Sequence, residues 1–91
     1  MQEKSHKIAQ LSIELGKILK KLRNENTSLT LEKLAYEYDI PKGTLSKIEN
    51  GKQKCLFVNL WKIAEAHGVK CSSVVKLLED ELGSDFKLMD E

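Results

Sequence analysis

The sequence predicts an all-α fold of five helices in one small domain. Apolar residues recur at intervals of three and four along most of the chain, which is the spacing of one face of a helix. Glycines and a single proline separate these stretches at positions suited to helix ends. No segment has the alternation of apolar and polar residues that a half-buried strand requires. A chain of 91 residues is long enough for one domain with a modest core.

The first helix is predicted from an apolar stripe that starts at Ile8 and continues for four turns through Leu11, Leu15, Ile18, Leu19 and Leu22. Gly16 lies inside this stretch, where it weakens a helix by about 1 kcal/mol relative to alanine. We therefore expect a close packing contact at Gly16. Residues 24–28 are predicted to form the turn that follows.

The second and third helices are predicted to follow each other almost without a loop. Thr30 is a plausible N-cap for a helix whose apolar face consists of Leu31, Leu34, Ala35 and Tyr38. Asp39 and Ile40 leave room only for a tight turn, and aspartate tolerates the left-handed conformation that such turns often need. Pro41 suits the start of the next helix, which runs from about Lys42 to Asn50 and ends at Gly51. Two short helices joined in this way form a helix-turn-helix.

A fourth helix is predicted from near Leu56 to Gly68, with Phe57, Leu60, Ile63, Ala64 and His67 on its inward face. His67 is expected at the edge of the core, and Trp61, beside this face, in the core or on a dimer surface. A fifth helix runs from about Cys71 to Gly83, with Val74, Leu77 and Leu78 inward.

Composition narrows the class of protein. With 41% hydrophobic and 32% charged residues, the chain has the composition of a soluble globular protein. No apolar run approaches the length of a membrane span, and the first residues lack the apolar stretch of a signal peptide. We therefore expect a cytoplasmic protein without a membrane partner, in which Cys55 and Cys71 are free thiols.

The sequence contains no arrangement typical of catalysis. His6 and His67 are far apart and neither has a second ligand at metal-binding spacing. No serine–histidine–aspartate grouping, glycine-rich phosphate loop or pair of active-site carboxylates is evident. We expect no enzyme activity, no cofactor and no metal site.

The net charge of +1 conceals an uneven distribution. Residues 41–54 contain four lysines and a single acid, whereas residues 62–91 contain seven acids and four lysines. A local basic stretch opposite an acidic end is a weak indication of nucleic-acid binding. A solvated mixed surface explains the same asymmetry about equally well.

The two central helices have two different faces. Their apolar residues, Leu34, Ala35, Ile40, Leu45 and Ile48, would join the helices to each other and to the domain. The remaining face of the third helix carries Lys42, Gly43, Thr44 and Lys47. In a helix-turn-helix this face enters the major groove of DNA with its N-terminal end first.

Three stretches, "LGKILKKLR", "LTLEKLAYEYDIPKGTLSKIENGK" and "LWKIAEAHGV", occur in this order between Leu15 and Leu78. This part of the chain resembles the Cro/C1-type helix-turn-helix family of phage repressors and xenobiotic-response-element regulators. The resemblance implies a five-helix, lambda-repressor-like domain over residues 15–80. Residues 1–14 would then be an N-terminal extension that includes the start of the first helix, and residues 81–91 an acidic tail.

The resemblance also implies a function: a homodimer that binds specific double-stranded DNA and regulates transcription. In the family, an arginine late in the first helix often bridges the glutamate of the "ENG" sequence, which here are Arg23 and Glu49. The sequence departs from the family at Leu31, where glutamine is frequent, and at Asp39, where glycine is usual. Gly43 occupies a position where a base-reading side chain is common.

The expected DNA-binding residues are Thr30, Lys42, Gly43, Thr44, Ser46, Lys47, Asn50, Lys52 and Lys54. Lysines can reach the O6 and N7 atoms of guanine, and a threonine methyl can meet a thymine methyl. Each role has a plainer alternative. The lysines would be merely solvated, Thr44 would pack on the second helix, Thr30 would only cap its helix, and Asn50 would first of all form a helix end.

Two other functions remain open at this stage. On the same fold, an antitoxin would bind a toxin protein through a segment such as the acidic tail and would also bind its own operator. A relic of the fold would no longer bind DNA. The dimer surface is expected on the fifth helix and on Phe86, Leu88 and Met89, which would otherwise pack back on their own chain.

Overall fold

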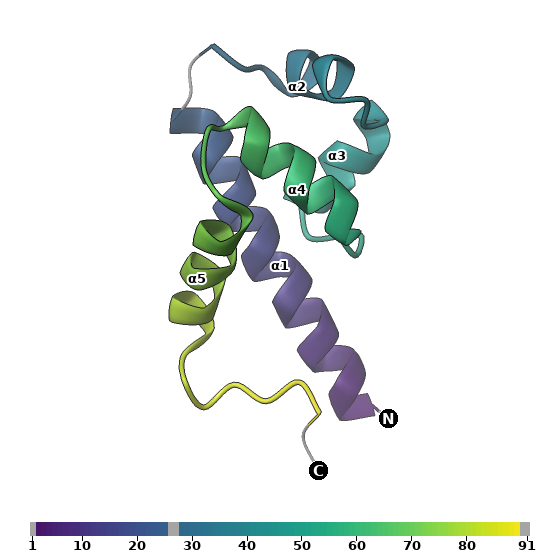
Figure 1. Cartoon of the computed structure of the whole chain (residues 1–91). Helices are drawn as coiled ribbons and strands as arrows, with labels where there is room; N and C mark the ends of the chain where they lie inside the picture. Colours follow the sequence, from purple (N-terminus) through teal and green to yellow (C-terminus); the bar gives the residue numbers. More distant parts are fainter. Residues whose placement is uncertain (1, 26–27, 90–91) are drawn as a thin grey trace.

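The computed structural model describes residues 2–25 and 28–89, with side chains from His6 onward in these ranges. Its five helices are α1 (Gln2–Glu25), α2 (Leu31–Glu37), α3 (Lys42–Glu49), α4 (Phe57–Ala66) and α5 (Cys71–Leu82) (Figure 1). The described residues form no strand. The predicted all-α fold of five helices is therefore confirmed.

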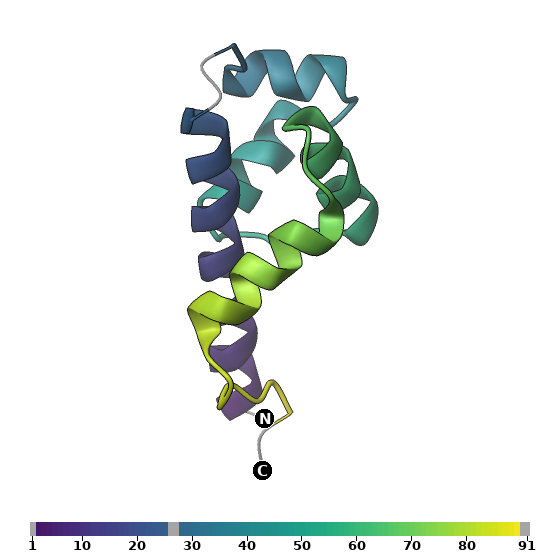
Figure 2. The ribbon, with the colours of Figure 1, turned by 60° about the vertical axis from the view of Figure 1, so that its left-hand side comes forward.

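The long helix α1 organises the domain. Both α3 and α5 pack against it, while α2 packs on α3 and α4 packs on α5 (Figures 1 and 2). Residues 83–89 turn back along the N-terminal half of α1, where the Nζ atom of Lys7 lies 5.1 Å from the ring centre of Phe86. The helix-turn-helix is thus held at one end of the molecule, and the chain termini lie at the other.

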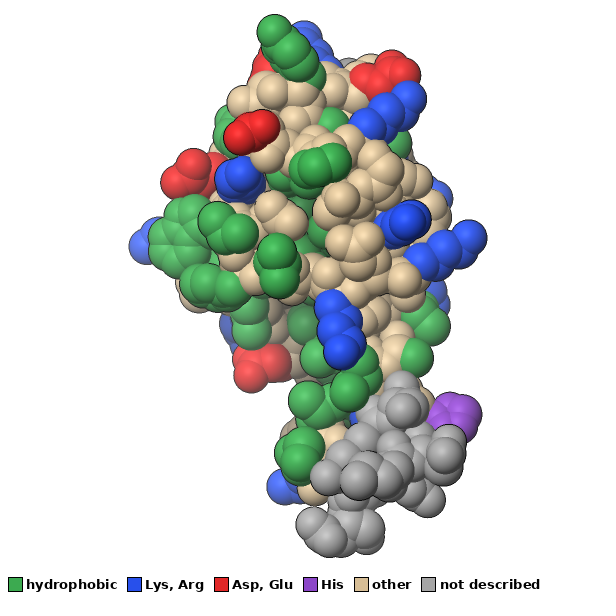
Figure 3. Space-filling model, turned by 90° about the vertical axis from the view of Figure 1, so that its right-hand side faces the viewer, with side chains coloured by type: hydrophobic (Ala, Val, Ile, Leu, Met, Phe, Trp, Pro, Cys, Tyr) green, Lys and Arg blue, Asp and Glu red, His purple; other side chains and the backbone are tan. Residues whose placement is uncertain are grey.

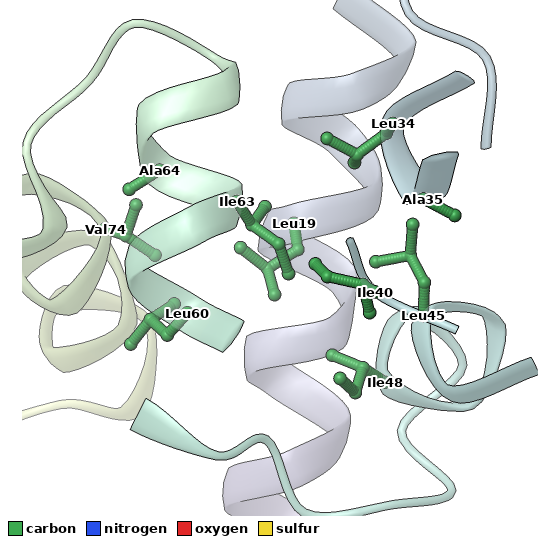
Figure 4. Packing of buried hydrophobic residues seen from close by; sticks show 10 residues of the cluster. All are labelled: Leu19, Leu34, Ala35, Ile40, Leu45, Ile48, Leu60, Ile63, Ala64 and Val74. Atoms are coloured by element: carbon green, nitrogen blue, oxygen red, sulfur yellow. The ribbon is translucent and has the colours of Figure 1, made fainter. Parts of the chain in front are cut away.

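All five helices contribute to one core (Figure 4). Its ten buried side chains are Leu19, Leu34, Ala35, Ile40, Leu45, Ile48, Leu60, Ile63, Ala64 and Val74. Full burial of a large aliphatic side chain stabilises the folded state by about 1.5–3 kcal/mol. Since half of these residues belong to α2, α3 and the turn between them, the core fixes that pair firmly to the rest of the domain.

Gly16 makes the close contact expected of it. A Cβ atom at this position would lie 2.5 Å from the backbone oxygen of Ile48 and 2.7 Å from that of Glu49. The absence of a side chain therefore lets α1 approach the last turn of α3. The glycine that weakens α1 locally is needed for tertiary packing.

The structure corrects the predicted ends of α1. This helix begins at Gln2, before the apolar stripe, and it includes Asn24, which was predicted to lie in a turn. A charged and polar segment can extend a helix that is already anchored elsewhere, because most helical stability in proteins comes from tertiary packing. Residues 26–27 of the predicted turn lie outside the described residues.

Two side chains predicted to face inward are exposed. The side chains of Phe57 in α4 and Leu77 in α5 are 66% and 48% exposed. Residues advance by about 100° around a helix, so the stripe of Val74 and Leu78 leaves Leu77 at its margin. In α4 the buried face is formed by Asn59, Leu60, Ile63 and Ala64. Phe57, in the first turn, lies outside this face.

His67 lies at the edge of the core, as expected. Both of its ring nitrogens are buried, and neither has a hydrogen-bond partner among the described residues. Burial holds the pKa of His67 below its ordinary value, while the nearby Glu49 carboxylate opposes this shift and Arg23 adds to it.

Cys55 and Cys71 are free thiols. Burial, with a smaller effect from Cys71, raises the pKa of Cys55 to about 11. A thiol with this pKa is protonated at neutral pH and is a poor nucleophile, so the site lacks the features of a redox sensor.

Candidate nucleic-acid interface

The turn between α2 and α3 has the tight geometry that the sequence indicates. Thr30 caps α2, with its Oγ1 atom accepting a hydrogen bond of 3.1 Å from the backbone N–H of Lys33. Asp39 has a φ of +56°, in the left-handed region expected for it. The backbone N–H of Ile40 donates to the carbonyl of Ala35 over 2.9 Å, which closes the turn.

Contacts on the inner side hold this turn in place. The five apolar residues expected to join α2 and α3, namely Leu34, Ala35, Ile40, Leu45 and Ile48, are all buried. From α4, the Nζ atom of Lys62 donates a 3.0 Å hydrogen bond to the carbonyl oxygen of Asp39. The role of Lys62 was not expected from the sequence, because it joins residues 23 positions apart.

The outer face of α3 is polar and open to solvent. Lys42, Gly43 and Lys47 are exposed, and Thr44 and Ser46 are half-buried. Seen from the side of α2 and α3, this end of the molecule presents polar surface bordered by lysine side chains (Figure 3). No described atom lies within 4 Å of a Cβ atom built on Gly43, so packing does not demand glycine there.

Lys42 already has a partner within the chain. Its Nζ atom lies 2.7 Å from Oε2 of Glu32 in the first turn of α2. This hydrogen bond and the charge of Lys42 lower the pKa of Glu32. Because both side chains are exposed, water screens this pair and the pair contributes little to the stability of the fold. Lys42 can therefore exchange this carboxylate for a phosphate or a base at little energetic cost.

The end of α3 and the loop after it position three more of the expected DNA-binding residues, Asn50, Lys52 and Lys54. The side-chain amide of Asn50 donates a 2.9 Å hydrogen bond to the carbonyl of Ser46, which ends the helix. The backbone N–H of Lys52 donates to the carbonyl of Lys47 over 2.8 Å. Gly51 has a φ of +70° and fits closely against Ile13 of α1. The side chains of Lys52 and Lys54 are both exposed.

Behind α3, Arg23 and Glu49 form the ion pair that the resemblance implies. The Nε and Nη2 atoms of Arg23 lie 2.8 and 3.0 Å from the two oxygens of Glu49. The side chains are 16% and 4% exposed, so water screens this pair little. The bond to Glu49 raises the pKa of Arg23. This two-point contact fixes the end of α3 to α1.

These contacts connect most of the expected DNA-binding residues. Thr30 caps α2, and Glu32 in the first turn of the same helix binds Lys42. Ser46 and Asn50 share one helical turn, and Lys52 is bonded to Lys47. The outcome is a polar helix face with exposed lysine side chains around it, an arrangement suited to binding a polyanion.

Other kinds of site find no support in the described part of the chain. Its histidine, cysteine and acidic residues form no group that is able to hold a metal ion. None of its helices is both long and apolar enough to cross a membrane.

Comparison with known proteins agrees with this geometry. Residues 19–74 match the family model described as helix-turn-helix. Over 71 residues the chain is 39% identical to control protein C.MunI from Mycoplasma sp., an alignment that covers 78% of this chain and 96% of that protein. The chain therefore belongs to the Cro/C1-type helix-turn-helix family of DNA-binding transcription regulators.

Proposed function

We propose that this protein binds a specific double-stranded operator as a homodimer, with α3 of each copy in the major groove. The observation that carries the proposal is the exposed polar face of α3, on a helix fixed from behind by the core and by the Arg23–Glu49 pair. A recognition helix needs this combination, because base edges can be distinguished only by side chains held in one position.

The position of each residue suggests its role. Lys42, Thr44 and Lys47 lie on the outer face of α3, where they would meet base edges. Five other residues would meet phosphates. Thr30, Asn50, Lys52 and Lys54 flank the ends of α2 and α3, and Ser46 lies within α3. Thr30 and Asn50 would combine this role with capping a helix.

Gly43 gives the recognition helix a particular property. With open space around its Cα atom, the backbone of the first turn of α3 can approach the DNA more closely than a side chain would allow. One step of each half-site would then be read weakly or only through its shape.

A homodimer accounts for specificity better than a monomer. One small domain makes few contacts, and proteins of this type pair on half-sites separated by about one helical turn. Neither the matched family nor the control-protein relative favours the antitoxin alternative.

Selection of bound duplexes from a random DNA pool tests this function. The selected sequences should contain an inverted repeat whose half-sites are centred about 10 base pairs apart, or a multiple of this distance. Titration should show tighter binding to the selected duplex than to a scrambled duplex of equal length. A pool that shows no enrichment, together with equal affinity for both duplexes, would refute the proposal.

A further inference from the structure

Three lysines on α1 border the end of the recognition helix. Lys17, Lys20 and Lys21 are exposed, and they line a hollow of about 460 Å³ between α1 and the end of α3. Asn24 of α1 and Asn50, which follows the last residue of α3, line the same hollow. Figure 2 shows α3 lying beside α1. We call this hollow the α1–α3 groove.

The helical repeat explains why these side chains face α3. Gly16, Lys20 and Asn24 are four positions apart, so they follow one row along α1. Gly16 touches the backbone of the last turn of α3. The row therefore leads from this packing contact into the α1–α3 groove, with Lys20 next to the end of α3.

Asn50 joins the α1–α3 groove to the outer face of α3. It follows Lys47 by three positions, and both side chains are exposed on this face. The hydrogen bond from its side-chain amide to the carbonyl of Ser46 holds Asn50 in place. A DNA strand with a phosphate at Asn50 would therefore lie at the edge of the groove.

The α1–α3 groove has an excess of positive charge. Its three lysines face two acids, Glu25 and Glu49. The carboxylate of Glu49 is 4% exposed and is neutralised by Arg23, so it offsets the lysines little. Lys17 also lies 3.7 Å from Glu14, in an exposed pair that water screens. The lysines can therefore attract an anion from solution.

We infer that the α1–α3 groove binds phosphates of the DNA strand that flanks the site read by α3, with Lys20 as the central contact and Lys17 and Asn24 beside it. The identity of the ligand as DNA rests on the proposed function. The groove adds to that function a set of backbone contacts outside the helix-turn-helix. Lysine binds phosphate as a point charge, and an asparagine side chain can donate a hydrogen bond to a phosphate oxygen.

The length of the lysine row suits a DNA strand. Lys17 and Asn24 are about 10 Å apart along α1, because a helix rises by about 1.5 Å per residue. Each strand of a duplex carries one phosphate per about 3.4 Å of the duplex axis. The row is therefore long enough to follow more than one phosphate of the same strand.

The neighbouring surface fits DNA less well. On the other side of α1, Lys21 shares a second hollow with Glu81 of α5. Glu79 and Asp80 are exposed on the same helix as Glu81. These acids would repel phosphates and would confine the strand to the α3 side of α1. An acidic protein segment is the alternative ligand, but the continuity between the groove and the outer face of α3 favours DNA.

Titration of lysine variants against DNA tests this inference. Lys20→Ala should weaken binding to selected and scrambled duplexes alike and should lower the salt slope by about one unit. Lys17→Ala/Lys20→Ala should lower the slope further. Lys76→Ala is the matched control, because it removes an exposed lysine from α5. It should leave the salt slope unchanged. Circular dichroism checks that each variant keeps the native fold.

Ethylation of single phosphates in the selected duplex locates the contact. A neutralised phosphate that flanks the half-site should weaken binding of the wild-type protein, because it removes the charge that Lys20 would meet. The same ethylation should have little effect on Lys20→Ala, which has already lost the contact.

The possible results separate this inference from the proposed function. If the wild type prefers the selected duplex while both α1 variants keep its salt slope, the inference is overturned and the operator function stands. An equal loss of slope in Lys76→Ala would also overturn it, since net charge alone would explain the effect. Lower slopes in the α1 variants of a protein that prefers no duplex would uphold the groove and refute the operator function. A wild type that binds no duplex would refute both.

Discussion

Replacement of Gly16 by alanine should destabilise the domain, although alanine is the better helix former. The added Cβ atom would lie 2.5 Å from the carbonyl oxygen of Ile48, whereas ordinary contacts begin near 3.4 Å. Helix α1 would have to retreat from α3 by up to about 0.9 Å. The three atoms nearest to it, one on Ile48 and two on Glu49, belong to the backbone and cannot rotate away.

Two opposing energies decide whether Gly16→Ala raises or lowers the stability of the domain. Alanine in a helix interior gains about 1 kcal/mol over glycine. Overpacking of a tight contact costs about 1–3 kcal/mol, and sometimes more. The retreat would also stretch the ion pair between Arg23 and Glu49, whose complete loss would cost about 3–5 kcal/mol. We expect a net loss of about 1–3 kcal/mol in the free energy of unfolding.

Thermal melts monitored by circular dichroism measure this effect. Gly16→Ala should melt lower than wild type by about 4–8 °C for each kcal/mol lost. Gly43→Ala is the matched control, because its Cβ atom meets open space and the change should raise the melting temperature. A Gly16→Ala variant that melts at or above wild type would show that α1 and α3 are not in close contact.

Three further predictions concern charged and titrating groups. Arg23→Ala should lower the free energy of unfolding by about 3 kcal/mol, because it leaves Glu49 buried without a partner. In urea melts, the double variant Arg23→Ala/Glu49→Leu should recover part of this loss. Equal stability of the single and double variants would contradict the prediction. Because the pKa of His67 is lowered in the folded state, the stability of the domain should fall as the pH decreases below about 6.5. His67→Leu should flatten this part of the curve of stability against pH. An unchanged curve would assign the pH dependence to other groups. Glu32→Gln should tighten DNA binding severalfold by releasing Lys42, and its melting temperature should stay close to that of wild type. Weaker DNA binding would instead show that Glu32 positions Lys42.

Local sequence features predicted the fold well where the chain's own periodicity determines it. Leu34, Ala35 and Ile48 were expected in the core because their spacing places them on the inner faces of two helices, and all three are buried. The tight turn was expected from Asp39, whose short side chain tolerates the left-handed backbone that the structure shows. These features depend on neighbours in sequence, so no knowledge of the tertiary arrangement was needed.

Periodicity does not reveal where a core ends. Phe57 continues the spacing of Leu60 and Ile63, yet it lies beyond the edge of the packed region and is exposed. Leu77 lies three positions after the buried Val74 in α5. The adjoining helix covers the opposite edge of the apolar stripe of α5, so Leu77 stays exposed. Both errors could be recognised only after the helices had been placed against each other.

Contacts between distant residues were the least predictable part of the candidate site. Glu32 and Lys42, in the first turns of α2 and α3, meet across the two packed helices, a contact that spacing alone does not encode. Arg23 and Glu49 are 26 positions apart and were paired only through the family resemblance. Lys62, which binds the carbonyl of the turn, has no sequence signal at all.

Titration of Lys47→Ala and Lys52→Ala against selected and scrambled duplexes at two salt concentrations tests most directly whether α3 reads DNA sequence. Lys47→Ala should lose about 1–3 kcal/mol on the selected duplex and little on the scrambled one, because a base contact discriminates between sequences. Lys52→Ala should weaken both duplexes alike and lower the salt slope by about one unit, as expected for a lost phosphate contact. If both variants instead lose affinity uniformly on the two duplexes, α3 contacts only the DNA backbone and the central claim is wrong.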